Sequence, residues 1–312
     1  MTKNSVTALN LNIEPKALKP LFQTRPVVHA TAIVYNWAII LGSIYLCTQY
    51  FNPFAYFLAV LVIGARMHAL AILMHDATHY RFLKNRKWND LITDITTMYP
   101  LFTSLEQYRQ NHLRHHKHLN TEHDPDWVSK LGVEEFRFPK SRGEFLWIVF
   151  SYLILYRGVK DAIWFLKRFQ LKDGKQPPKT FREKLPKMAF YLILFSALTV
   201  LGGWKYYALF WVVPYFSTFF MFQYIRSVAE HFGEMEHDHV LTSSRTVKAT
   251  AIERFFLAPH NVSYHLEHHL YPGVPFYNLP KLHQLLMQES EYAGKAHITQ
   301  GYWKGLMKEL GG

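Results

Sequence analysis

The sequence predicts an all-α integral membrane protein with four transmembrane helices in two hairpins and a cytoplasmic helical cap that carries histidine clusters. Three observations lead to this fold class. Hydrophobic residues make up 49% of the 312 positions and charged residues only 19%, below the roughly 25% of soluble domains. No charged residue occurs in residues 26–65, and 40 such positions can cross a bilayer twice. Most of the 18 histidines lie outside such apolar runs.

The charge balance narrows the class of partner. Lys and Arg number 35 against 23 Asp and Glu, so the formal net charge is +12. Such a charge suits nucleic acid, a membrane surface or acidic partners, but the long apolar run has no use in a soluble nucleic-acid binder. We therefore expect a membrane partner and no nucleic acid. The single cysteine, Cys47, excludes a disulfide framework and any Cys-based metal site.

The first hairpin is expected at residues 30–50 and 54–74, each close to the roughly 20 residues that a spanning helix needs. Asn52 and Pro53 separate the two helices, because proline disfavours helix in the residue before it. Arg66 lies towards the end of the second helix. A long cation there can extend its charge to the membrane interface.

The second hairpin is expected at residues 188–204 and 206–225, which contain no charged residue. A Gly-Gly pair near the junction marks the turn. Two further apolar stretches, residues 91–105 and 145–156, are too short or too interrupted to span a bilayer. We expect them to form interfacial or partly embedded helices.

The distribution of Lys and Arg orients the spans. Residues 76–185 contain 20 of them, residues 227–312 contain seven and residues 1–29 contain four. Because basic loops stay on the cytoplasmic side, all three regions are expected there, in a multi-pass protein. The predicted division is a cytoplasmic N-terminal segment, a catalytic domain over residues 30–285 and a cytoplasmic tail over residues 286–312.

Histidines recur at helical spacing in three clusters. Spacings of three and four residues place side chains on one helical face, so each cluster can direct its imidazoles at one point. A random order of the same residues would give about 0.06 His-x-x-His-His triplets, whereas two occur. The clusters are His75 and His79; His112, His115 and His116; and His265, His268 and His269.

Imidazoles without thiolates restrict the metal. Eight imidazoles exceed the four ligands of one structural zinc ion. They favour two metal ions, each with coordination positions left open for oxygen or water. Neutral imidazole binds Zn, Cu, Fe and Ni, and iron is the choice that activates O₂. His75 directly follows the second predicted span, so the site is expected at the cytoplasmic membrane surface. A histidine-rich metal transporter or sensor is the alternative from another class, but it would place ligands near the bilayer midplane.

The clusters and their surroundings resemble the membrane fatty acid desaturase and lipid hydroxylase superfamily. The similarity includes the spacing of the clusters, HNVSYHLEHHLYP at residues 260–272 and VPFYNLPKLH at residues 274–283. The resemblance implies a non-heme diiron oxidoreductase that uses O₂ and two electrons to desaturate a fatty acyl chain of a lipid. A hydroxylase or ketolase of a carotenoid, alkane or sphingolipid is the alternative on the same scaffold.

The resemblance also implies a ninth ligand. SVAEH at residues 227–231 is similar to the segment that supplies an extra histidine in alkane hydroxylases, which points to His231. Acyl-CoA desaturases begin this segment with Asn, where this chain has Ser227. They also show one more residue between the histidines of the first cluster. The third cluster opens with His265 rather than Gln, and no His-Pro-Gly-Gly motif of a cytochrome b5 domain occurs. Both observations argue against a desaturase with a fused electron donor. The donor is therefore expected to be a separate ferredoxin, rubredoxin or cytochrome b5 type protein.

Several charged residues are candidates for orienting the imidazoles, as carboxylates commonly do around metal ligands. Arg226 is spaced to pair with Glu230 one helical turn later. Six further histidines are expected to be exposed or structural instead of ligating: His118, His123, His237, His239, His283 and His297. The candidate orienting carboxylates are Asp76, Asp124, Glu230 and Glu267.

Overall fold

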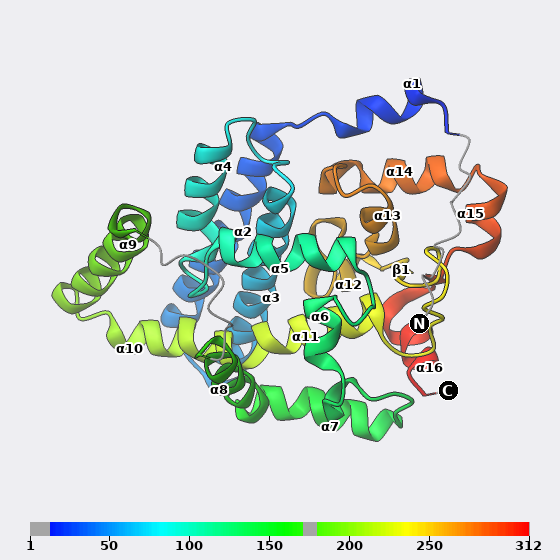
Figure 1. Cartoon of the computed structure of the whole chain (residues 1–312). Coiled ribbons are helices and arrows are strands. Elements are labelled where there is room, and N and C mark those ends of the chain that lie inside the picture. Colours follow the sequence, from blue (N-terminus) through cyan, green and yellow to red (C-terminus); the bar gives the residue numbers. More distant parts are fainter. Residues whose placement is uncertain (1–12, 171–179, 312) are drawn as a thin grey trace.

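The computed structural model describes residues 13–170 and 180–311, and these residues are mostly helical (Figure 1). Two strands of two residues each, β1 (Thr246–Val247) and β2 (Ile298–Thr299), pair in parallel and form the only sheet within these ranges. The predicted helical fold class is therefore confirmed for this part of the chain.

The first predicted hairpin consists of α2 (Pro26–Gln49) and α3 (Pro53–Thr78). Each helix begins with a proline, whose missing N–H would have no partner in the first turn. The Asn52 side chain caps α3 by accepting a hydrogen bond from the N–H of Ala55 at 2.9 Å. The helices are longer than predicted, because α2 starts at residue 26 rather than 30 and α3 ends at residue 78 rather than 74.

Another long apolar helix contains the predicted span at residues 206–225. With α2 and α3 it is one of three helices, among the residues described, that are long and apolar enough to cross a membrane. Its segments are α10 (Trp204–Tyr207), the π-helical η4 (Ala208–Val212) and η5 (Tyr215–Phe219), and α11 (Phe220–His231).

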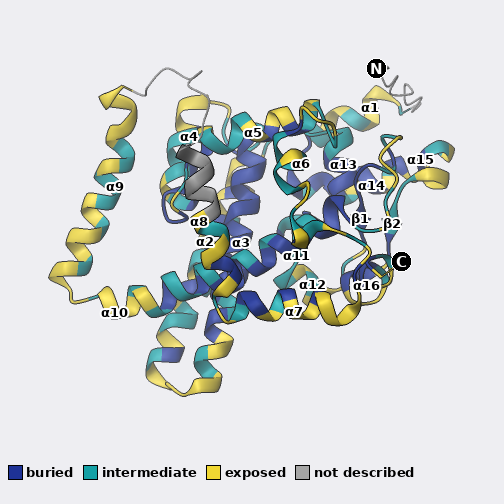
Figure 2. Cartoon of the chain, turned by 60° about the horizontal axis from the view of Figure 1, so that its bottom comes forward, coloured by how far each residue is buried: buried dark blue, intermediate teal, exposed yellow. Residues whose placement is uncertain are grey.

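The remaining predicted span, residues 188–204, is divided between α9 (Phe181–Val200), a turn and α10. Its predicted end was wrong, because the chain already turns at Gly202, whose φ of 65° is a conformation that glycine adopts without strain. α9 has 20 residues and its first turns are charged, so it is not among the three candidate spans. It has no buried residue and lies to one side of the molecule (Figure 2), where the Tyr191 hydroxyl donates to the Tyr99 carbonyl at 2.9 Å.

Short helices connect and cover the long ones. The apolar stretch at residues 145–156 forms α7 (Arg142–Leu153). The stretch at residues 91–105 is helical only as far as η2 (Asp94–Met98), before Pro100. The other short helices are α1 (Pro15–Leu18), η1 (Lys19–Phe22), α4 (Arg86–Thr93), α5 (Leu105–Lys117), α6 (Pro125–Lys130), η3 (Glu134–Phe136), α8 (Tyr156–Gln170), α12 (Ala251–Phe256), η6 (Pro259–Asn261), α13 (His265–Leu270), η7 (Phe276–Asn278), α14 (Leu279–Leu286), α15 (Ser290–Lys295), η8 (Gly301–Leu306) and α16 (Met307–Glu309).

α3 is the central helix of the molecule. In its apolar window 78% of the residues are buried, against 22% for α2. Gly64 allows a close approach to the third long helix, since a Cβ there would lie 1.9 Å from Thr218 Oγ1. The Thr218 hydroxyl donates to the Val60 carbonyl at 2.7 Å. This packing holds the middle of α3 against the third long helix.

The C-terminal residues pack into the body of the molecule. Tyr292, Tyr302 and Leu310 are buried. Glu309 pairs with Arg245 at 2.9 Å. The predicted tail at residues 286–312 thus contacts the same elements that carry the histidines, while its separation as a domain stays a prediction.

Candidate metal centre

All nine histidines proposed from the sequence come together in two groups. Within each group, the nitrogens that could bind a metal lie within 4.8 Å of one another. One group has five members and the other has four. The five-histidine group is His75, His79, His112, His116 and His268, and the four-histidine group is His115, His231, His265 and His269.

Two helices supply both groups because their histidines lie on adjacent faces. In α5, His112 and His116 are one turn apart and belong to the five-histidine group, whereas His115 belongs to the other. In α13 the division is reversed: His265 and His269 are one turn apart in the four-histidine group, and His268 joins the five. α3 contributes only to the five-histidine group, and α11 only to the four-histidine group.

The imidazole nitrogens converge in the way that ligands of one ion do. In the five-histidine group, the Nε2 of His112 lies 3.0 Å from that of His79 and 2.9 Å from that of His116. The Nε2 of His116 also lies 2.9 Å from that of His268. A neutral imidazole has at most one hydrogen on Nε2, so these contacts cannot all be ordinary hydrogen bonds.

The four-histidine group shows the same spacing. The Nε2 of His265 lies 2.9 Å from that of His231 and 3.0 Å from that of His269. Two nitrogens about 2.1 Å from one ion are about 3.0 Å apart at a right angle and about 3.4 Å apart at a tetrahedral angle. The observed distances therefore fit right-angled ligands better than a tetrahedral zinc site.

Burial keeps four of these imidazoles, those of His79, His116, His268 and His269, in the neutral form that a metal needs. Burial lowers the pKa of His79 to about 4 and that of His116 to about 2. Burial and neighbouring imidazoles together hold the pKa of His268 and of His269 well below the usual value. A lowered pKa means that the neutral form dominates at neutral pH, which leaves a nitrogen lone pair available to a cation.

A small cavity adjoins both groups. Its volume is about 10 Å³, close to the space that one water molecule needs. His75 and His268 line it from the five-histidine group and His265 from the four-histidine group. Four of the other six lining residues are apolar; these six are Ile72, Asp76, His260, Val262, Phe276 and Leu279. A small molecule in this space would touch both groups at once.

A sequence model of the fatty acid desaturase family matches residues 51–301 of this chain, which include every histidine of both groups. The chain belongs to the fatty acid desaturase family. This membership makes it an oxidoreductase, and it confirms the superfamily expected from the histidine clusters.

Similar proteins act on different substrates. A dihydrorhizobitoxine desaturase of Bradyrhizobium elkanii is 33% identical over 92% of this chain and 83% of its own length. An sn-1 acyl-lipid omega-3 desaturase (ferredoxin) of Nostoc sp. is 23% identical over 86% of this chain and 77% of its own. A chloroplastic omega-6 fatty acid desaturase of Spinacia oleracea is 25% identical, and the match spans 54% of that protein.

Two of the four candidate carboxylates contact a histidine of the desaturase centre. Asp124 is fully buried and accepts a hydrogen bond from Nδ1 of His115 at 2.8 Å. Glu230 lies 3.3 Å from Nδ1 of His265, and the predicted pair with Arg226 is present at 2.6 Å. The carboxylate of Asp124 on Nδ1 fixes the His115 ring so that Nε2 points at the metal position, whereas Nδ1 of His265 has no hydrogen-bond partner among the described residues.

The other two carboxylates have different partners. Asp76 accepts a hydrogen bond from the N–H of Phe276 at 3.1 Å and lies 3.4 Å from Nδ1 of His29. Glu267 contacts His283 at 2.5 Å, together with Tyr292 and Thr246. Neither carboxylate orients a histidine of the two groups.

The six histidines expected outside the centre belong to neither group. His123 and His237 are exposed. His283 is buried against Glu267, and His297 contacts Glu309 at 2.9 Å. The remaining two, His118 and His239, are partly exposed.

Two residues near the centre were not found from the sequence. Tyr108 stacks on His112 with ring centroids 5.1 Å apart, and the spacing of one turn in α5 was the available signal. Arg245 is fully buried and donates to the carbonyls of Ala229 and Phe232, each at 3.0 Å. It thereby caps the end of α11, beside His231. No local spacing marks Arg245, because its partners are distant in sequence.

Replacing Asp124 with asparagine is expected to weaken metal binding at the four-histidine group by about 10- to 100-fold. The amide can still cap α6, but it no longer provides a charged acceptor for the His115 ring. Titration of the metal-free protein with Co²⁺, followed by absorbance, would measure the affinity. Asp238→Asn, at an exposed position outside both groups, is the control. Equal affinities for the two variants would contradict the orienting role of Asp124.

Proposed function

We propose that this protein is a membrane-bound non-heme diiron desaturase, which uses O₂ and two electrons to introduce a double bond into a fatty acyl chain of a lipid. The observation that carries the proposal is the convergence of nine histidines into groups of five and four in a chain of this family. The overall reaction consumes O₂, two electrons and two protons, removes two hydrogens from adjacent carbons and releases two water molecules.

The histidines would hold one iron ion in each group. Bound iron would supply the activation of O₂ that an unactivated CH₂ group requires. The chain itself holds the His115 ring in place through Asp124, and Glu230 lies 3.3 Å from Nδ1 of His265. The apolar residues that line the cavity beside His75 and His268 limit access of water, and they suit an alkyl group next to the metal positions.

The proposed membrane arrangement has four spans with the centre on the cytoplasmic side. α9 would be the fourth span, paired with the long helix that begins at α10. Its apolar side chains are exposed, with Leu192 and Ile193 each 70% and Val200 83% accessible. Exposed apolar residues without a protein partner suit contact with lipid. The ends of α3 and α11, which carry histidines, would then face the cytoplasm.

This topology predicts different accessibility at two positions. A cysteine at Glu122, whose side chain is 86% exposed in the cap, should react with a membrane-impermeant maleimide from the cytoplasmic side. A cysteine at Lys205, in the first turn of the third long helix, should react only from the opposite side. Cys47 is buried, so the unsubstituted protein serves as the unlabelled control. Equal labelling of both positions from the cytoplasm would contradict the four-span arrangement.

The electrons would come from a separate protein of the ferredoxin, rubredoxin or cytochrome b5 type. Support comes from the similar desaturase of Nostoc sp., whose name includes ferredoxin.

A second candidate is the desaturation of a small molecule. The dihydrorhizobitoxine desaturase favours it, because that protein is 33% identical over 92% of this chain. The metal groups would act in the same way, and the substrate would differ. Oxygenation of a lipid, carotenoid or alkane is the further outcome that the same centre could give.

Mass spectrometry of a host that expresses this chain would test these functions. Acyl-lipid desaturation predicts lipids that lack two hydrogens, whereas oxygenation predicts an added oxygen atom. Small-molecule desaturation predicts unchanged lipids and a new unsaturated metabolite. A variant with His112 and His116 replaced by alanine is the control, since it lacks two residues of the five-histidine group. Identical lipid and metabolite profiles for both proteins would contradict the proposed enzyme.

A further inference from the structure

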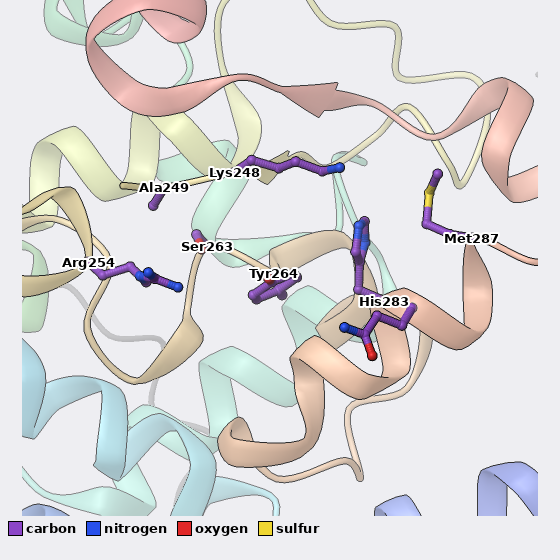
Figure 3. Close-up of a pocket in the computed structure, with 8 residues that line it drawn as sticks. Lys248, Ala249, Arg254, Ser263, Tyr264, His283 and Met287 are labelled. Carbon is purple, nitrogen blue, oxygen red and sulfur yellow. The ribbon is translucent and has the colours of Figure 1, made fainter. Parts of the chain in front are cut away.

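A basic pocket lies behind the third histidine cluster and is not part of the metal centre (Figure 3). Its volume is about 480 Å³, within the usual range of small-ligand sites. α12, the segment before α13, and α14 form its walls. Figure 3 shows Lys248 and Arg254 on either side of Ser263 and Tyr264, with His283 opposite.

The charges around this pocket are unbalanced. Lys248 and Arg254 line it, and no carboxylate does. Neither cation forms an ion pair within the described residues. The nearest acid in sequence, Glu253, accepts hydrogen bonds from the N–H groups of Tyr302 and Trp303 at 2.8 and 3.0 Å. Two cations beside a hollow without a counter-charge attract an anion.

Polar groups inside the pocket can complete the recognition of such an anion. His283 is fixed through Nδ1 by Glu267 at 2.5 Å, which leaves Nε2 as its remaining nitrogen. Ser263 and Gln284 contribute a hydroxyl and an amide to the lining. Several donors arranged around a concave space suit a phosphate, which has several acceptor oxygens.

The position of α12 indicates a lipid as the source of the phosphate. The Arg66 guanidinium of α3 lies 4.0 Å from the ring centre of Phe255 in α12. Arg66 precedes the end of α3 at Thr78 by 12 residues, or about 18 Å, so α12 lies beside the spanning part of α3. Ile252 of α12 is 74% exposed, and Trp303, whose backbone N–H donates to Glu253 of the same helix, is 72% exposed. An exposed apolar pair beside cations is typical of a membrane interface.

We propose that this pocket binds the phosphate of an anionic phospholipid head group, with Ile252 and Trp303 in contact with its acyl chains. Lys248 and Arg254 neutralise the phosphate, and the Ser263 hydroxyl and the Gln284 amide donate to it. The pocket lies directly behind α13, which carries three of the nine histidines. A lipid bound there would secure this edge of the cap to the membrane. The proposal does not depend on which substrate the enzyme desaturates.

Native mass spectrometry of the purified full chain, loaded with phosphatidylglycerol or phosphatidylcholine, would test the site. The double variant Lys248→Gln with Arg254→Gln should bind phosphatidylglycerol about 30-fold more weakly. Each cation is expected to contribute about fivefold to the affinity, and the two contributions multiply. Phosphatidylcholine should bind the wild type and the variant alike. Lys304→Gln with Lys308→Gln is the matched control, because it removes two exposed cations that do not line the pocket.

Two further measurements distinguish a phospholipid from a free anion or a protein partner at this pocket. Inorganic phosphate should compete only weakly with phosphatidylglycerol; competition at equal affinity would overturn the lipid assignment in favour of a free anion. Binding of a ferredoxin should be the same for the pocket variant and the control. A loss of ferredoxin binding with unchanged lipid binding would overturn the proposal and make the surface a protein-docking site. Both variants change exposed side chains, and equal melting temperatures would verify that they fold.

Discussion

Replacing His231 with alanine is expected to lower the metal content from two ions to one per chain and to reduce turnover by more than about 100-fold. His231 is one of four histidines in its group, and its Nε2 lies 2.9 Å from that of His265. Without it, three imidazoles remain for that ion. The five-histidine group contains no residue of α11, so it should keep its metal.

Elemental analysis of the purified variant, together with a single-turnover assay, would measure both effects. His237→Ala is the control, since His237 is close in sequence but exposed and outside both groups. Its metal content should match that of the wild type. If the two variants held the same amount of metal, His231 would not be a ligand. Complete loss of both ions from His231→Ala would instead indicate one shared site.

Replacing Glu267 with alanine should have a wider effect and remove both metals. The buried carboxylate contacts Tyr292 at 2.7 Å and His283 and Thr246 at 2.5 Å each. Alanine leaves these three buried groups without their acceptor, at an expected cost of about 3–5 kcal/mol in the free energy of unfolding. Because α13 supplies both histidine groups, its displacement should disturb both metal positions.

Thermal denaturation and the metal content together would test the role of Glu267. Glu267→Gln retains one acceptor oxygen, so both its melting temperature and its metal content should be intermediate. Glu122→Ala changes a side chain that is 86% exposed, and it should behave as the wild type. Wild-type stability with two bound ions in Glu267→Ala would show that the contacts of Glu267 do not hold α13.

Much of the centre could be predicted because its spacing is local. Histidines three and four residues apart share a side of a helix whatever the helix packs against. The pair of Arg226 and Glu230 follows from the same rule and is present at 2.6 Å. The first hairpin was equally predictable. An uncharged run of this length can span a bilayer twice, and a spanning segment must be helical to satisfy its backbone hydrogen bonds. Asn52 and Pro53 then mark the turn between the two helices.

The division of the histidines into five and four could not be predicted. His115 and His116 are neighbours in sequence, yet they belong to different groups. Successive residues of a helix point about 100° apart, and the packing of α5 against α13 decides which group each imidazole reaches. Spacing alone also suggested Glu267 as a partner of the clustered histidines. The structure instead directs it to Tyr292 and His283, with which no local pattern connects it.

The sequence by itself predicted the helical fold class and the nine histidines that the structure brings together, while the side of the membrane on which they lie stays a prediction. These properties depend on composition and on spacings of a few residues. Tertiary structure alone decided that Arg245 caps the helix of His231 and that Glu309, near the end of the chain, pairs with Arg245. It also placed Lys248 and Arg254 beside one pocket with His283. Such contacts depend on how distant segments pack, because side chains far apart in sequence meet only when the fold forms.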